Sequence, residues 1–489
     1  MKDKAFVFND TETTGLNTWF SQIIQIGSVL TDSEFNVDEE LNISSKVLPW
    51  VVPTKGAYET HKQVENLSDG MSHYEMMHFL KDKWLNWGKS KELVHVTYNG
   101  MSFDEELFRR QFYWNLIDPY LTTNRNGSSR IDLMVILFII ANFYQKKINM
   151  PKDEDGNIRY KLGMVAEANG ISSLNAHDAV VDCYLMINLV RLINKVAPEV
   201  WQSAIQASSK KGLISMLNEG PFSMFAEIVK GQCFNYPVYP CAQNQKKLNE
   251  LLLVDLYFDP NELFEMSYSE LKGQFGKSGA FRKIAINKTQ PLMNASAISN
   301  ADSFLDLSIE ELTKRAEQIK GNEDFKNNLS QILEDDDKTW PEKTIVEQKI
   351  YDGFSSDADK LWMERFEIST WDEKVKLVNG FEDERYRELA ERIICYQKPE
   401  FANEEMLENF NNLVRSRLYS KGPWNNPGET LDQAIHNVEI ALKESEDDEK
   451  KEIYKKLLEH YNLRRFNFLS LDYSINDAKF WMVNVMQFS

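Results

Sequence analysis

Two carboxylates stand two residues apart near the start of the chain, where the run Ala5 to Asn9 leads into Asp10 and Glu12. The run has the composition of a β-strand, and successive side chains of a strand point to opposite faces, so both acids should project to the same side. Each carboxylate would raise the pKa of the other, which favours a divalent cation between them. The alternative is a strand-end turn with incidental acids, since such triplets are common in surface turns.

A third acid, Asp104, follows a β-like run that ends at Tyr98 and lies in the first turn of a helix predicted from Phe103 to Leu116. The helix dipole favours an anion at this position, so capping of the helix is the alternative explanation for this residue. The residue types predict a second acidic position close to a strand end.

His177 and Asp182 lie at the start of a helix predicted over residues 178–196. With His177 at the helix entry and Asp182 just over one turn later, both can face one cleft while Val180 and Val181 turn toward the core. A histidine alone in such a place is more often structural.

Together the four acids and the histidine follow the order of the DEDDh exonucleases: Asp-x-Glu at a first strand, Asp after an aromatic residue at a middle helix, and His-x4-Asp at a last helix. Other segments resemble bacterial exonuclease I. These segments are Thr31 to Val37, Phe112 to Tyr120, Ala168 to Ile171, Ile286 to Lys288 and Gly353 to Asp359. The resemblance spans all three parts of the chain, from the first domain through Asp359, and fades in about the last 100 residues.

The resemblance implies a 3′–5′ exonuclease that removes 5′-mononucleotides from single-stranded DNA with Mg²⁺, in DNA repair and recombination. For the fold it implies an RNase-H-like mixed-sheet α/β domain over residues 1–198, a small SH3-like β-barrel domain with helical insertions over 199–347, and an all-helical C-terminal domain over 348–489. The order of the sequence patterns agrees with this domain organisation. β-like runs such as Ile23 to Leu30 and Ile43 to Leu48 occur near the start of the chain, and long amphipathic helical patterns occur near its end. The resemblance also implies single-stranded DNA-binding protein as a partner.

Phosphodiester hydrolysis needs an activated water and neutralisation of charge on the phosphoryl and leaving oxygens. Two hard cations can do both, and carboxylates suit Mg²⁺ or Mn²⁺. We therefore expect Asp10, Glu12 and Asp182 to be direct ligands, with Glu12 also touching the substrate end. Asp104 is expected to bind the second ion partly through water, and His177 to act as the general base, since its ordinary pKa lies near neutrality.

A glycine-bearing basic segment from Gly273 to Lys283 is the best sequence candidate for holding the strand, because single-strand binders combine basic groups with flat side chains. An ordinary β-hairpin with a solvated basic face is an equal alternative. The substrate-binding residues predicted there are Lys277, Phe281, Arg282 and Lys283. The weaker candidates, for which plain surface is the favoured alternative, are Arg109, Arg110, Lys146, Lys147, Lys210 and Lys211.

The 489 residues carry a formal net charge of −19, most of it between residues 301 and 450, which disfavours indiscriminate binding of nucleic acid but does not exclude a local basic groove. The four cysteines form no CxxC pair and are expected to be reduced thiols. The longest apolar run, Leu133 to Ala141, is far shorter than the ~20 residues of a membrane span. We expect a cytoplasmic monomer without membrane contact.

Two other functions stay open at this point. A DEDDh nuclease that acts on RNA, or on mismatches as a proofreader, would use the same five residues, although such relatives usually consist of little more than the catalytic domain. A scaffold that binds single-stranded DNA without cutting it is the candidate from another class, and the presence of all five residues disfavours it.

Overall fold

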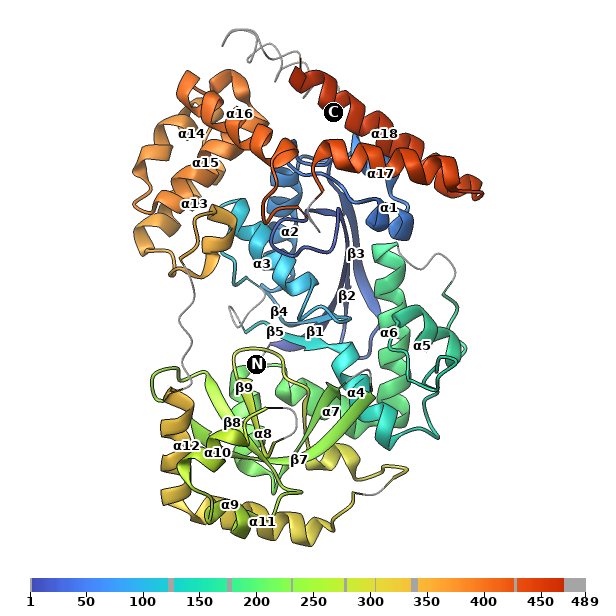
Figure 1. Cartoon of the computed structure of the whole chain (residues 1–489), viewed down its shortest axis with the longest axis vertical. Helices are drawn as coiled ribbons and strands as arrows, with labels where there is room; N and C mark the ends of the chain where they lie inside the picture. Colours follow the sequence, from blue (N-terminus) through green and yellow to red (C-terminus); the bar gives the residue numbers. More distant parts are fainter. Residues whose placement is uncertain are drawn as a thin grey trace.

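The computed structural model describes residues 2–121, 127–173, 178–229, 232–276, 279–303, 305–335, 342–425 and 429–469, with side chains as far as residue 465. These residues form three parts that follow one another along the longest axis of the molecule (Figure 1). The N-terminal part lies in the middle, a second sheet with its helices lies below it, and the C-terminal helices lie above it in this view.

The N-terminal part is built on a five-stranded sheet in the order β3-β2-β1-β4-β5. The central strand β1 pairs antiparallel with β2 and parallel with β4, so the predicted mixed α/β sheet is confirmed. The strands are β1 (Asp3–Thr13), β2 (Ile23–Thr31), β3 (Val37–Ser44), β4 (Lys91–Thr97) and β5 (Ser129–Asp132).

Side chains of β1 alternate between two hydrophobic cores. Ala5 and Val7 pack with side chains of the helices α2 and α3, whereas Phe6 and Phe8 pack with those of α4 and α6. Asp10 and Glu12 continue the alternation of Phe6 and Phe8, which directs them toward α6. The helices of this part are α1 (Lys55–His61), η1 (Val64–Leu67), α2 (His73–Trp87), α3 (Asp104–Trp114), α4 (Leu133–Phe143), α5 (Leu162–Ala168) and α6 (Ala179–Val196).

The second sheet is antiparallel, in the order β10-β6-β7-β8-β9. Its two end strands, β10 and β9, are not paired with each other within the described residues, so closure into an SH3-like barrel stays a prediction. The strands are β6 (Ser223–Val229), β7 (Gln232–Gln243), β8 (Glu250–Asp255), β9 (Phe281–Ala285) and β10 (Leu292–Asn294). The helices are α7 (Pro198–Ala207), α8 (Lys210–Glu219), α9 (Pro260–Phe264), α10 (Tyr268–Gly273), η2 (Ala295–Ile298), α11 (Ile309–Gly321) and α12 (Glu323–Asp335).

The C-terminal part contains only helices among the residues that the structure describes, as predicted. They are η3 (Val346–Tyr351), α13 (Asp357–Ile368), α14 (Trp371–Leu377), η4 (Val378–Gly380), α15 (Glu384–Gln397), η5 (Pro399–Phe401), α16 (Glu404–Tyr419), α17 (Leu431–Glu444) and α18 (Asp448–Leu469). None of the described helices in the whole chain is both long and apolar enough to cross a bilayer. All four cysteines are free thiols.

One predicted strand was wrong. The sequence favours Ile43 to Leu48 because it is apolar, but the strand β3 lies earlier, over Val37–Ser44. β3 is the edge strand of the sheet, and an edge strand can expose polar side chains such as those of Asp38, Glu39 and Glu40. The hydrophobic pattern therefore misplaced the strand.

A glycine sets how closely α6 approaches the sheet. Gly27 lies opposite Asp10 in the β1–β2 ladder, and a Cβ added to it would lie 2.4 Å from the carbonyl carbon and oxygen of Ala179. These are backbone atoms at the start of α6, so a side chain there would have to push the helix away from the strand.

We expect Gly27→Ala to lower the free energy of unfolding by about 1–3 kcal/mol, because overpacking shifts backbone. Gly56→Ala is the matched control, since an added Cβ at Gly56 meets nothing within 4 Å. Urea denaturation of both variants measures the difference. Equal stability of the two variants would show that the position of α6 does not depend on the absence of a Cβ at residue 27.

Candidate active site

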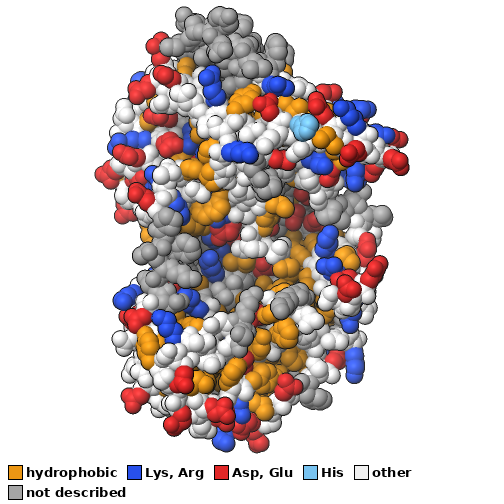
Figure 2. Space-filling model, in the orientation of Figure 1, with side chains coloured by type: hydrophobic (Ala, Val, Ile, Leu, Met, Phe, Trp, Pro, Cys, Tyr) orange, Lys and Arg blue, Asp and Glu red, His pale blue; other side chains and the backbone are white. Residues whose placement is uncertain are grey.

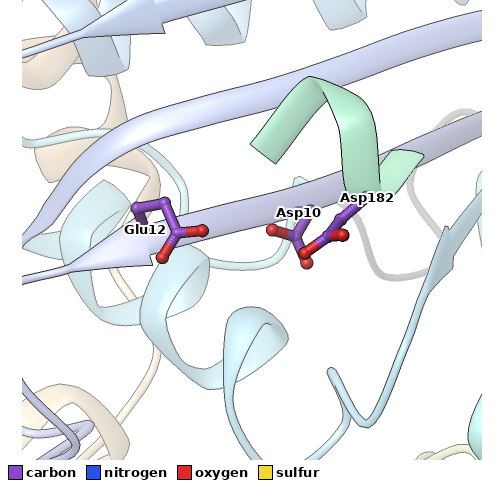
Figure 3. A group of neighbouring side chains, drawn as sticks. All are labelled: Asp10, Glu12 and Asp182. Atoms are coloured by element: carbon purple, nitrogen blue, oxygen red, sulfur yellow. The ribbon is translucent and has the colours of Figure 1, made fainter. Parts of the chain in front are cut away.

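Three of the predicted acidic residues meet at one point between β1 and α6. A carboxylate oxygen from each of Asp10, Glu12 and Asp182 lies within 4.8 Å of the other two. Figure 3 shows the carboxylates of Asp10 and Asp182 facing each other, with Glu12 farther along the same strand. We call these three residues the carboxylate cluster.

The fold explains why these residues meet. Asp10 and Glu12 share one face of β1, and Gly27 on the neighbouring strand lets the backbone of Ala179 lie against the sheet next to Asp10. Asp182 follows Ala179 by three residues, so it lies on the same side of α6 one turn later. The cluster thus depends on a strand period of two and a helix period of about 3.6.

Asp104 lies beside the cluster but is not one of the three. It is the first residue of α3 and is buried, and the Thr11 hydroxyl donates a hydrogen bond to its Oδ1 at 2.5 Å. Thr11 lies between Asp10 and Glu12 on β1, so its side chain points to the opposite face of the strand. The structure therefore holds Asp104 from the α3 side of β1, and its predicted contact with a second ion through water stays a prediction.

Burial and mutual repulsion raise the pKa values of these acids. Burial is the largest cause at Asp10, where the charges of Asp104 and Asp182 also act, and its pKa lies well above the usual range. Burial, Asp182 and Asp104 raise the pKa of Glu12 to about 9. Burial raises the pKa of Asp104 to about 7, although the Thr11 hydrogen bond opposes the rise. Bringing these groups together as carboxylates requires positive charge.

The donor atoms fit a hard divalent cation. The cluster offers only carboxylate oxygens, and no described cysteine or histidine belongs to it. Oxygen ligands of this kind suit Mg²⁺, Mn²⁺ or Ca²⁺ better than soft metals. The cation would also supply the positive charge that the raised pKa values call for.

A further acid, Asp178, is the N-cap of α6, and sequence reasoning missed it. Its Oδ1 accepts hydrogen bonds from the backbone N–H groups of Val180 and Val181 at 3.1 and 3.4 Å. Its charge also raises the pKa values of Asp10 and Glu12. An Asp at the start of a predicted helix is a capping signal that could have identified it. His177, the predicted general base, immediately precedes Asp178 in the sequence and lies outside the described residues.

The backbone that follows Glu12 is held by buried groups that the sequence did not single out. The Nε2 atom of His61 donates to the carbonyl oxygen of Thr13 at 3.1 Å, while its Nδ1 accepts from the backbone N–H of Gln63 at 3.0 Å. The next carbonyl, that of Thr14, accepts from the backbone N–H of Thr54 at 2.8 Å. No local sequence pattern pairs Thr13 with His61 or Thr14 with Thr54, because these partners lie 48 and 40 positions apart.

The predicted DNA-holding segment is corrected in two places. Phe281 is 1% exposed and packs in the core with Phe275 and Phe325, so no base can stack on it in this structure. Arg282 is 6% exposed, and its Nε pairs with Glu227 at 3.1 Å. Lys283 is exposed, and Lys277 lies outside the described residues.

Two family models match different parts of the chain. A model described as exonuclease matches residues 7–190, and a model of the exonuclease I C-terminal domain matches residues 344–463. Exodeoxyribonuclease I of Haemophilus influenzae is 26% identical over 409 residues, which are 80% of this chain and 85% of the relative. The enzyme of that name from Escherichia coli is 25% identical over 388 residues, 74% of this chain and 79% of the relative.

Solved structures agree with the fold. Exonuclease I from Methylocaldum szegediense superposes with a TM-score of 0.78 at 22% identity, covering 94% of this chain and 99% of that one. Escherichia coli exonuclease I in complex with a dA16 oligonucleotide gives a TM-score of 0.78 at 21% identity, covering 94% and 100%. With family models at both ends and relatives that align over most of its length, the chain belongs to the exonuclease I family.

Proposed function

We propose that this protein hydrolyses single-stranded DNA from its 3′ end and releases 5′-mononucleotides. The observation that carries the proposal is the convergence of Asp10, Glu12 and Asp182 on one point, with Asp104 beside them. The relatives named exodeoxyribonuclease I support the same activity. The cellular setting that we propose is DNA repair and recombination in the cytoplasm.

Mg²⁺ is the proposed cofactor, held by Asp10, Glu12 and Asp182, with Asp104 reaching a second ion through water. Bound divalent cations would lower the pKa of the attacking water and neutralise charge on the phosphoryl oxygens. The protein's contribution is a rigid arrangement of oxygens, because Asp10 and Glu12 lie on a central strand and Thr11 fixes Asp104. A zinc-bound form is known for the Escherichia coli exonuclease I complex with single-stranded DNA.

His177 is the proposed general base. In the step that we propose, the oxygen of water attacks phosphorus, the bond from phosphorus to the 3′ oxygen of the preceding nucleotide breaks, and the water proton passes to the imidazole. An imidazole with a pKa near neutrality suits this transfer. The leaving 3′ oxygen then takes up a proton from solvent, and the released nucleotide keeps its 5′ phosphate.

The proposed partners are single-stranded DNA and single-stranded DNA-binding protein. A solved structure of Escherichia coli exonuclease I contains a dA16 oligonucleotide, and another solved structure is of SSB/exonuclease I in complex with an inhibitor. Action on RNA or on mismatches is a weaker candidate, because the match to exonuclease I includes the C-terminal helices as well as the nuclease sheet.

A timed digest tests the proposal directly. Single-stranded DNA labelled at its 3′ end should release labelled mononucleotide at once, whereas a 5′ label should remain on steadily shortening products. Chelator should stop both reactions. Duplex DNA and RNA of the same sequence are the comparison substrates, and equal rates on RNA would contradict the proposed specificity.

The raised pKa of Glu12 predicts a pH-dependent effect of metal on stability. Between its ordinary pKa of 4.5 and the folded-state value of about 9, the folded protein binds more protons than the unfolded chain, so metal-free stability falls as pH rises through this window. A bound cation favours the deprotonated form and opposes this loss. Mg²⁺ should therefore raise the Tm more at about pH 8 than at about pH 6, as measured by calorimetry. Equal increments at both pH values would contradict the assignment.

Loss of the proposed base should separate turnover from binding. We expect His177→Ala to keep its affinity for single-stranded DNA while kcat falls by about two orders of magnitude or more. His436→Ala, which removes an exposed histidine of α17, is the matched control. Near-normal turnover of purified His177→Ala would refute the role of His177.

Loss of a metal ligand should abolish metal-dependent hydrolysis altogether. We expect Asp182→Ala to be inactive with Mg²⁺, because the cluster then lacks the ligand contributed by α6. The control is Asp448→Ala, in which an exposed acid is lost from the first turn of another helix. Full activity of Asp182→Ala in excess Mn²⁺ would show that Asp182 is not a ligand.

A further inference from the structure

A small cavity lies where the C-terminal helices meet the nuclease part, and we call it the junction cavity. Phe20 and Trp114 line it from the nuclease part, and Glu347, Arg417 and Trp424 line it from the C-terminal part. Its volume is about 30 Å³. A single water needs about 10–15 Å³ on the same scale, so the cavity has room for one small ion and is too small for a nucleotide.

Arg417, on α16, is the arginine that lines this cavity. Its side chain is 4% exposed, and its Nη2 donates to the two carboxylate oxygens of Glu347 at 2.8 and 2.9 Å. Its Nη1 is buried and has no hydrogen-bond acceptor among the residues that the structure describes. A buried N–H group of a cation is costly when it lacks an acceptor. This side of the guanidinium therefore needs an acceptor that the cavity can hold.

Two aromatic rings restrict the orientation of the same guanidinium. Its central carbon lies 4.4 Å from the centre of the Trp424 ring and 5.1 Å from the centre of the Phe20 ring. The segments that carry these rings are joined, because Asn17 Nδ2 donates to the carbonyl oxygen of Pro423 at 3.0 Å. Ring faces stabilise a cation, but they supply no oxygen to accept from Nη1.

Two indole N–H groups add further donors. The Nε1 atoms of Trp114 and Trp424 are buried and have no acceptor within the described part of the chain, and both residues line the junction cavity. An indole N–H can donate but cannot accept. Together with Nη1 of Arg417, three residues that line one cavity each have a buried donor without a partner. A water would bring two more protons, whereas an anion brings only acceptor capacity.

The buried charges leave one positive charge uncompensated. Glu347 is 2% exposed, and it is shared by two buried cations, Arg392 at 2.8 Å and Arg417. Burial lowers the pKa of Arg417, Glu347 opposes this, and Arg392 adds to it. Two other acids are near. The side chain of Glu388, which pairs with Arg392, is 52% exposed, and Glu429 is half-buried at the cavity, so solvent screens both more strongly than Glu347.

The outer surface does not select for an anion. Figure 2 shows acidic and basic side chains interspersed over the C-terminal helices, so no field of a single sign covers this part of the face in view. Selection must therefore come from the donors inside. A divalent anion such as sulfate would bring a second negative charge that the one uncompensated cation does not balance. The size and charge of the cavity both favour a small monovalent anion.

We propose that the junction cavity binds one chloride ion, which accepts from Nη1 of Arg417 and from the indole N–H groups of Trp424 and Trp114. The ion joins the nuclease part to the C-terminal helices, because it contacts both. The site is separate from the proposed nuclease activity, since neither DNA nor a divalent metal takes part. Because the ion binds only where both parts are assembled, it should stabilise the folded protein by mass action.

Bromide identifies the site directly, because it is a monovalent spherical anion with an anomalous X-ray signal. Crystals of the wild-type protein grown in sodium bromide should show an anomalous peak within hydrogen-bonding distance of Arg417 Nη1 and Trp424 Nε1. This experiment requires no variant, so its result does not depend on whether a substituted chain folds. Water alone in the cavity at high bromide concentration would overturn the proposal.

Thermal unfolding without DNA, in chelator, tests the site in solution. At equal ionic strength, sodium chloride should raise the Tm of the wild type above its value in sodium gluconate, whose anion is too large for the cavity. Trp424→Phe removes one donor and keeps a ring over Arg417. We expect it to raise the chloride concentration for half of the effect about tenfold or more, as for loss of one hydrogen bond to a charged group.

Trp362→Phe is the matched control, because Trp362 lies 5.1 Å from the guanidinium of Arg365 on α13, away from the cavity. Its chloride dependence should equal that of the wild type. An unchanged chloride dependence of Trp424→Phe would overturn the proposal. A bromide peak without any chloride effect on Tm would show binding at crystal concentration only and would also overturn it. None of these outcomes affects the nuclease proposal, which depends on the end-label digest.

Discussion

Burial of several like charges at one point is the constraint on which the rest of this structure depends. Glu12 and Asp104 are buried, Asp10 and Asp182 adjoin them, and the pKa values of Asp10, Glu12 and Asp104 are raised. Such a group is unfavourable in a metal-free protein and becomes favourable when a cation compensates it. The fold must therefore supply stability from elsewhere, and it does so with a hydrophobic core on each face of the sheet.

The geometry of the site comes from rigid elements rather than from loops. β1 is the central strand, and although its pairing with β4 ends at Phe8, its pairing with β2 continues through Asp10 and Glu12 and limits their freedom. Asp182 lies on a long helix whose first turn rests against Gly27, and Asp104 is fixed by Thr11. Sites built on strands and helices hold their groups more precisely than loops do, which suits chemistry that depends on the spacing of oxygens.

Much of this site could be predicted from local periodicity. A period of two directs Asp10 and Glu12 to one side, a helical period places Asp182 one turn inside α6, and the structure shows the three together. Periodicity could not reveal Thr11 as the partner of Asp104, because that contact joins residues 93 positions apart. It could not place His61 beneath the Thr13 carbonyl for the same reason.

The segment around β9 shows a different limit of sequence reasoning. Its basic and aromatic residues predicted a DNA-holding segment or a solvated hairpin face, but Arg282 pairs with Glu227 on β6 and lies over the ring of Tyr236 on β7. The sequence of a strand does not indicate which of its two faces is covered by other parts of the protein, or which residues cover it. The weaker sequence candidates Arg109 and Arg110 are buried and lie against the half-buried rings of Tyr120 and Trp19, which the charge pattern alone could not indicate.

The C-terminal helices are mechanically connected to the acidic site. In α18 the Tyr461 hydroxyl donates to the carbonyl oxygen of Pro53 at 2.6 Å, and Arg464 donates to that of Val47 at 3.0 Å. The segment they hold continues to Thr54, which bonds to Thr14, two residues after Glu12. Because each contact is to backbone, displacement of α18 would be transmitted along the chain to the strand end. The third part of the molecule therefore supports the position of Glu12 in the carboxylate cluster.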